Sequence, residues 1–146
     1  MEVYKQVYKG MYRKSVHGVD ELLKHVELHH TKKDQVEIDG DMIKIGSDRY
    51  KTFKFKGLVC VKCRLEGSFF GKEKNLNNTT WHMNLYGYNT NGEEILMTKD
   101  HILPICKGGK DVLDNYQPMC ITCNFEKGGN LEPVTDHPQH GSNNQA

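Results

Sequence analysis

Residues 98–129 read TKDHILPICKGGKDVLDNYQPMCITCNFEKGG, and this stretch is the most informative about the fold and the site that the chain forms. It places a carboxylate beside an imidazole, at Asp100 and His101, and adds two amides further along, at Asn115 and Asn124. Carboxylate and amide oxygens suit a hard divalent cation, and an imidazole can take a proton from water near neutral pH. The stretch therefore predicts a site that combines a bound cation with a general base.

Two Cys-x-x-Cys pairs accompany this stretch, Cys60 with Cys63 and Cys120 with Cys123. In an intracellular protein such pairs favour metal binding over disulfides, although a single pair can also be redox-active. Two pairs supply the four thiolates of a closed tetrahedral zinc site. We therefore predict a structural zinc ion that ties the start of a short helix to a distant strand. The fifth cysteine, Cys106, is expected to be an ordinary, partly buried thiol.

Length and composition indicate a small protein of the intracellular kind. The chain has 146 residues and a hydrophobic content of 36%, which fits one domain with a small core and some appended elements. It has no apolar run of about 18 residues and no apolar N-terminal segment, so neither a membrane span nor a secretory signal is expected. We expect a cytoplasmic protein with no membrane partner.

The charge is unevenly distributed along the chain. The formal net charge is +1, but the stretch 49–74 holds eight basic and two acidic residues, a local charge of +6. Such an excess suits a polyphosphate partner. The alternative is a solvated, lysine-rich face without a ligand.

The N-terminal half mixes helical and strand signals. Apolar and aromatic residues at spacings of four predict a helical segment over residues 1–33, in which Asp20 caps a second helix that runs to about His30. Alternation on both sides of Asp39-Gly40 predicts a β-hairpin. A third strand is expected over residues 49–56, because this stretch alternates around Phe53 and Phe55. The glycines and asparagines of residues 64–78 indicate a loop.

The C-terminal half is expected to form the site. Residues 79–88 and 93–101 read as two strands joined by a turn, so that Asp100 and His101 stand at a strand end. A glycine-containing loop follows over residues 103–114, and then a stub of strand at 116–118. A short helix is predicted from Ile121 to about Gly128. Residues 131–146 are polar and are interpreted as a disordered tail.

The residues of this half suggest distinct roles. Asp100 and Asn124 offer oxygen ligands to magnesium or manganese. His101 points to the other face of the strand and can act as the base, with Asn115 orienting it. Lys107, Lys110 and Lys127 can meet phosphate groups. Each residue has a structural alternative, as a cap, a buried histidine or a solvated lysine, but their order between the cysteine pairs favours function.

Residues 58–63 and about 94–130 resemble the HNH endonuclease family, and in particular the small zinc-containing HNH proteins of bacteriophages. The resemblance implies an α+β fold with a ββα-metal (His-Me finger) core, a four-cysteine structural zinc, and N-terminal helical and β-hairpin additions. On this basis we divide the chain into an N-terminal helical segment (1–33), a zinc-containing nuclease domain with an added hairpin (34–130) and the tail (131–146).

The resemblance also implies an activity. His101 takes the place of the general base and Asn115 that of the residue that orients it, while Asn124 and Asp100 hold catalytic magnesium or manganese. Zinc is the structural cofactor, DNA is the expected partner, and host cytoplasm is the expected location if the chain is phage-encoded. The alternatives are a zinc-stapled nucleic-acid-binding module without turnover, and a nuclease for RNA or branched DNA. Residues 1–57 and the long interval between Cys63 and Asp100 have no counterpart in the family motif, so target specificity does not carry over.

Overall fold

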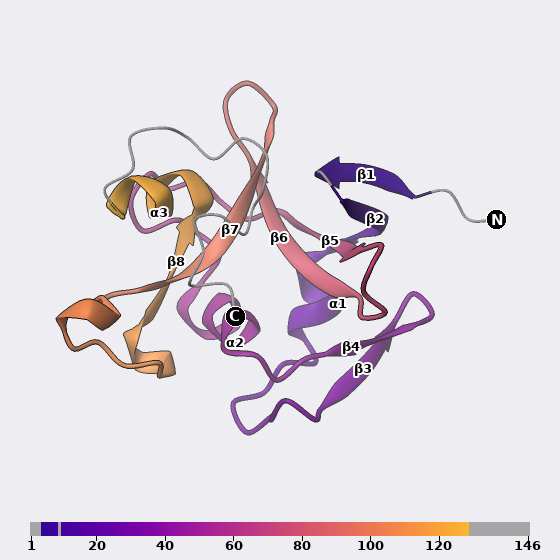
Figure 1. Ribbon diagram of the computed structural model, residues 1–146, viewed down its shortest axis with the longest axis horizontal. Coiled ribbons are helices and arrows are strands. Elements are labelled where there is room, and N and C mark those ends of the chain that lie inside the picture. Colours follow the sequence, from indigo (N-terminus) through magenta and orange to yellow (C-terminus); the bar gives the residue numbers. More distant parts are fainter. Residues whose placement is uncertain (1–3, 9, 129–146) are drawn as a thin grey trace.

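The computed structural model describes residues 4–8 and 10–128 and is a mixed α/β protein (Figure 1). Its strands are β1 (Lys5–Tyr8), β2 (Met11–Gly18), β3 (Gln35–Ile38), β4 (Asp41–Lys44), β5 (Phe69–Asn75), β6 (His82–Tyr88), β7 (Glu94–His101) and β8 (Tyr116–Cys120). Its helices are α1 (Val19–Leu23), α2 (Asp48–Lys56) and α3 (Ile121–Lys127), with 3-10 turns at Ile105–Lys107 and Leu113–Asn115.

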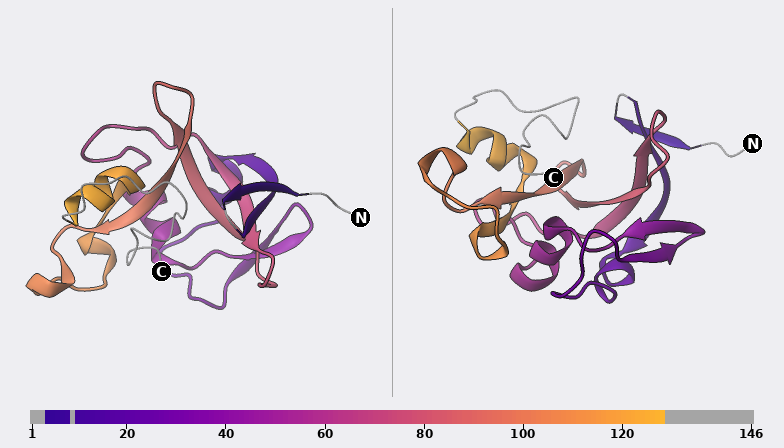
Figure 2. Two further views of the ribbon diagram at one scale, coloured as in Figure 1. Left: turned by 45° about the horizontal axis from the view of Figure 1, so that its top comes forward. Right: turned by 60° about the horizontal axis from the view of Figure 1, so that its bottom comes forward.

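Six strands form one antiparallel sheet in the order β1-β2-β5-β6-β7-β8, and β3 and β4 form a separate hairpin. Helices α1 and α2 and the β3–β4 hairpin cover one face of the sheet, where Phe53, Phe70, Met83 and Leu85 are buried in the core. Helix α3 lies on the other face, at the β7–β8 end (Figure 2). There Ile121 packs with Leu96 and Tyr86 in a second, smaller cluster.

The predicted N-terminal helix is wrong where the structure describes it, because residues 5–8 and 11–18 are strands. A spacing of four residues fits a helical turn, but it is also an even number and therefore keeps side chains on one face of a strand. Strand β1 pairs with β2, and β2 pairs with β5 over most of its length, so pairing in the sheet decides in favour of strands. Asp20 lies within α1, which ends at Leu23 and begins after Gly18.

Residues 48–56 form helix α2 where a third strand was expected. The Ser47 hydroxyl caps the helix by accepting a hydrogen bond from the Tyr50 backbone N–H at 3.3 Å. Tyr50 and Phe53 are buried at a helical spacing of three, whereas Phe55 is 42% exposed. The alternation of Phe53 and Phe55 was therefore misleading, because only one of them faces the core.

Strand β5 runs through the segment that was predicted to be a loop, between β2 and β6 in the sheet. Gly71 was interpreted as a turn former, but it lies within this strand. A Cβ atom there would come within 2.4 Å of Glu73 Oε2 and 2.7 Å of Arg13 Nε. The glycine thus makes room for the buried Arg13–Glu73 ion pair, whose Nε–Oε2 distance is 2.8 Å.

The other predicted elements are confirmed. The Asp39-Gly40 hairpin, the two strands of the central hairpin β6–β7 and the short helix after the second cysteine pair are all present. The strand after the loop is longer than the predicted stub, since β8 extends to Cys120. The predicted tail lies outside the described residues. Among the residues that are described, none of the helices has the length and apolarity needed to cross a membrane.

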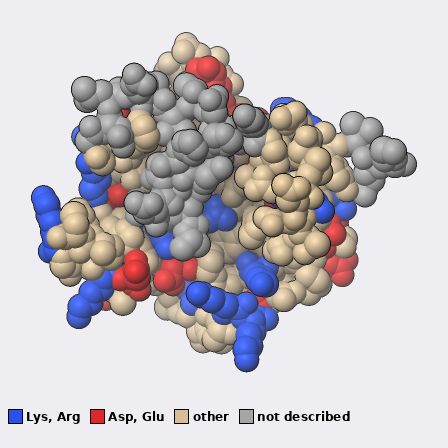
Figure 3. All heavy atoms as spheres, viewed as in Figure 1, with Lys and Arg blue, Asp and Glu red and all other residues tan. Residues whose placement is uncertain are grey.

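The basic stretch 49–74 does not form a continuous positive surface. Most of its cationic groups donate hydrogen bonds inside the protein: Arg49, Lys51, Lys54, Lys56 and Lys72. On the face shown in Figure 3, Lys and Arg side chains occur in separate groups among acidic ones. The basic side chains of this stretch therefore mainly donate hydrogen bonds to carbonyl oxygens and carboxylates of the protein itself.

Candidate metal centre and catalytic site

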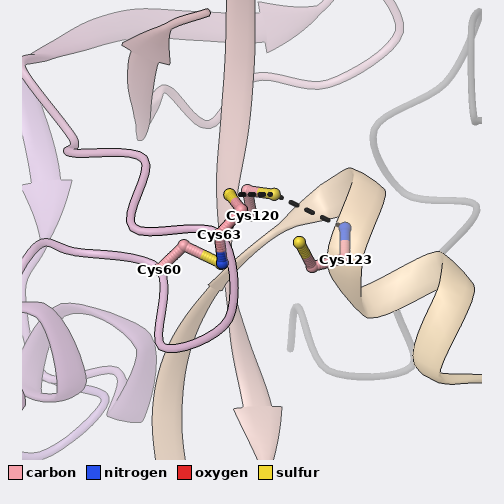
Figure 4. A group of neighbouring side chains, drawn as sticks. All are labelled: Cys60, Cys63, Cys120 and Cys123. Carbon is pink, nitrogen blue, oxygen red and sulfur yellow. Dashed lines mark hydrogen bonds between the residues drawn. The ribbon is translucent and has the colours of Figure 1, made fainter.

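The four paired cysteines converge where the loop after α2 meets the start of α3 (Figure 4). Their sulfur atoms all lie within 4.8 Å of one another, and the Cys63 and Cys120 sulfurs are 3.7 Å apart. A tetrahedral zinc ion with Zn–S bonds of about 2.3 Å separates its sulfur ligands by about 3.8 Å. The cluster can therefore hold zinc, as the sequence predicted.

Backbone groups already organise the thiols. The Cys63 N–H donates to Cys60 Sγ at 3.5 Å, and the Cys123 N–H donates to Cys120 Sγ at 3.4 Å. Burial opposes ionisation of Cys60, but backbone hydrogen bonds outweigh it and lower its pKa to about 7. Burial raises the pKa of Cys120, and raises that of Cys123 to about 12. Four thiolates in this space require the positive charge that a metal ion supplies.

Asp100 and His101 end strand β7, directly opposite Gln117 and Tyr116 of β8. Because neighbours on a strand point to opposite faces, the two side chains enter different surroundings. The His101 ring packs edge-on against Tyr116, and its Nε2 lies 2.6 Å from Asp111 Oδ1. The hydrogen bond to His101 holds the pKa of the Asp111 carboxyl below its usual range. His101 is thus oriented by a carboxylate.

Asp100 faces α3 on the other side of the hairpin. Its Oδ2 accepts hydrogen bonds from Gln117 Nε2 at 3.0 Å and from Lys127 Nζ at 2.6 Å. Two residues earlier on the same face, Thr98 Oγ1 accepts from Asn124 Nδ2 at 2.9 Å. The structure thus places Asp100 and Asn124 on facing surfaces of β7 and α3. Their oxygen donors fit a hard cation such as magnesium or manganese.

Asn115 closes the loop between β7 and β8. Its Oδ1 accepts from the Leu103 N–H at 2.9 Å, and its Nδ2 donates to the carbonyls of Leu103 and Lys110 at 3.0 and 2.9 Å. Gly109 is required within this clamp, because a Cβ atom there would lie 1.8 Å from the Leu103 carbonyl oxygen. Asn115 therefore fixes the backbone of the loop, and the loop in turn carries Asp111.

The predicted phosphate-binding lysines fall into two groups. Lys107 and Lys110 are exposed in the loop after His101. Lys127 instead bonds within the site, because its ammonium group also donates to the His101 carbonyl oxygen at 2.5 Å. Cys106 was expected to be partly buried but is exposed, since the 3-10 turn that carries it projects from the sheet.

The sequence reasoning did not identify Asp111 or Gln117. Gln117 was accessible in principle, because an antiparallel pairing that places His101 opposite Tyr116 also places Asp100 opposite Gln117. Asp111 carried no such signal, because its approach to His101 depends on the folded path of the loop.

Residues 89–137 match the family model described as HNH endonuclease, and residues 129–137 of this match lie beyond the described part of the structure. The matched segment includes Asp100, His101, Asn115 and Asn124. No curated protein and no solved structure matches the chain. The matched segment covers about a third of the chain and is similar to the HNH endonuclease family, a class of nucleases, and a nucleic acid is the substrate that this class implies.

Proposed function

We propose that this protein is a DNA endonuclease that hydrolyses phosphodiester bonds with one divalent cation, magnesium or manganese, and with His101 as the general base. The observation that carries the proposal is the Nε2–Asp111 hydrogen bond of 2.6 Å at the end of β7, within the family match and next to Asp100. A neutral imidazole that donates from Nε2 to a carboxylate keeps its basic nitrogen at Nδ1. Nδ1 is then the atom that takes a proton from the attacking water.

Asp100 and Asn124 are proposed to hold the cation. When bound there, a hard cation neutralises charge on the phosphate and on the leaving oxygen. Gln117 and Lys127 support this role by fixing the orientation of the Asp100 carboxylate through Oδ2. Lys107 and Lys110 are proposed to contact the DNA backbone from the loop after His101.

We propose that a structural zinc ion keeps α3 in a fixed position beside β7. Cys120 and Cys123 open the helix that carries Asn124, while Cys60 and Cys63 attach that helix to the loop after α2. Thiolate ligation fixes α3 beside β7 without requiring a large core.

Nicking of supercoiled plasmid in magnesium or manganese tests the proposal. The wild-type protein is expected to nick, and His101→Ala to lose about 100-fold or more of that rate, since general-base catalysis contributes about 10²–10⁴-fold. His82→Ala is the matched control, because His82 is an exposed histidine on β6 outside the site. No nicking by the wild type with either cation, or equal nicking by His101→Ala, contradicts the proposal.

Two further assays separate the alternatives. A gel shift with intact plasmid indicates a binding module without turnover, and a panel of RNA, branched and duplex DNA substrates separates the nuclease classes. The internal hydrogen bonds of the stretch 49–74 weaken the binding-module alternative, because that stretch was its main support.

A further inference from the structure

Thr98 is fully buried on β7, in the row of side chains that faces α3. Its hydroxyl oxygen lies 2.7 Å from the carbonyl oxygen of Met119 and 2.9 Å from Asn124 Nδ2. A threonine hydroxyl has one hydrogen to donate, and a carbonyl oxygen can only accept. The hydrogen therefore goes to Met119, and the Thr98 oxygen can act only as an acceptor toward Asn124.

This division of roles decides which way the Asn124 amide faces. An asparagine amide carries two N–H donors at one end and an accepting oxygen at the other. Reversing the amide would set its oxygen against the Thr98 acceptor, in a place where Asn124 is only 6% exposed and water cannot compensate. The Met119–Thr98–Asn124 chain of hydrogen bonds thus selects a single amide orientation.

We propose that Thr98 is a positioning residue for the catalytic cation. Thr98 accepts a hydrogen bond from the nitrogen of the Asn124 amide, so the amide oxygen points away from Thr98. An oxygen ligand is what a magnesium or manganese ion requires. This inference rests on the proposed function, in which Asp100 and Asn124 hold that ion. The buried hydroxyl of Thr98 does not itself bind the ion, but it affects ion affinity through the orientation of Asn124.

Manganese binding to the zinc-loaded protein without DNA, followed by electron paramagnetic resonance, tests the role of Thr98. Thr98→Val keeps the size of the side chain and removes the hydroxyl, and is expected to raise the manganese Kd by about 10–100-fold, the usual effect of losing a group that orients a metal ligand. Thr98→Ser keeps the hydroxyl and is expected to retain an affinity close to that of the wild type.

Thr52→Val is the matched control. Thr52 is also fully buried, and its hydroxyl donates to the Asp48 carbonyl oxygen at 2.7 Å within α2, on the opposite side of the hairpin from α3. Losing this hydroxyl removes a comparable hydrogen bond but leaves Asn124 untouched, so the manganese Kd is expected to stay unchanged.

An unchanged Kd in Thr98→Val, with wild-type circular dichroism and zinc content, would overturn the inference. An equal loss in Thr98→Ser would also overturn it, because the hydroxyl would then not be the cause. If Thr98→Val does not fold, Thr98→Ala gives the same test with room for a water molecule beside Met119. A wild type that binds no manganese would instead overturn the proposed cation site, and the role of Thr98 with it.

Discussion

Replacing Cys120 by serine is the most direct test of how the fold is held together. Cys120 is 2% exposed, and its sulfur lies 3.7 Å from that of Cys63. Serine cannot replace a thiolate ligand of zinc, and its hydroxyl would be buried without the metal. We therefore expect Cys120→Ser to lose zinc to a weak chelator that does not strip the wild type.

The size of the effect follows from the loop that the metal closes. Cys63 and Cys120 are 57 residues apart in the sequence, and a cross-link over a loop of this length restricts the unfolded chain by about 4 kcal/mol. For a chain of about 150 residues, a loss of 1 kcal/mol lowers Tm by about 2–4 °C, so Tm should fall by about 10 °C.

The assay is thermal unfolding followed by circular dichroism, together with the zinc content of each preparation. Cys106→Ser is the control, because Cys106 is an exposed cysteine outside the cluster, and this variant should keep both its zinc and its Tm. The reasoning is refuted if Cys120→Ser retains one zinc per chain and melts together with Cys106→Ser.

Three further predictions concern the surroundings of His101. Asp111→Asn is expected to slow plasmid nicking by about tenfold or more, because an amide no longer holds the proton on Nε2 of His101. Asp114→Asn, in the same loop, is the control and should nick at the wild-type rate. Equal nicking rates for Asp111→Asn and the wild type would contradict the role of Asp111. The lowered pKa of Asp111 also means that its stabilising contact persists above pH about 4 and is lost only below, so the Tm difference between Asp111→Asn and the wild type should close in acid. Burial, and then the hydrogen bond to Asp111, raise the pKa of Tyr116 to about 12. Its neutral form therefore stabilises the fold below the usual tyrosine pKa of about 10, and this contribution is lost as the pH rises toward 12. The tyrosinate absorbance of the wild type minus that of Tyr116→Phe should show this late titration, and a difference centred near pH 10 would contradict it.

Local signals in the sequence were sufficient for the elements around the site. Asp39-Gly40 defined a hairpin, and Cys120 and Cys123 stood at the start of the helix that carries Asn124. In each case the residues that determine the element lie within one turn or one helix, so their local sequence is enough to predict it. The cysteine cluster was also predictable, because four cysteines in two Cys-x-x-Cys pairs are a usual ligand set for zinc whatever the path of the chain between the pairs.

Local signals failed where a pattern fitted two structures. The spacing of four near the N-terminus suits both a helix and a strand, and the pairing of β1 with β2 and of β2 with β5 makes residues 5–8 and 11–18 strands. Phe53 and Phe55 alternate as in a strand, but the Ser47 cap and the burial of Tyr50 make that segment a helix.

The sequence by itself determined the chemical groups of this protein: four paired cysteine thiols, an adjacent carboxylate and imidazole, and an amide on a short helix. Only the tertiary structure decided how these groups are oriented. The Asp111 contact with His101 and the Thr98 contact with Asn124 join residues 10 and 26 positions apart in the chain. Hydrogen bonds of this kind depend on distances of about 3 Å, which the path of a folded loop or the packing of a helix on a strand sets and which residue spacing does not encode.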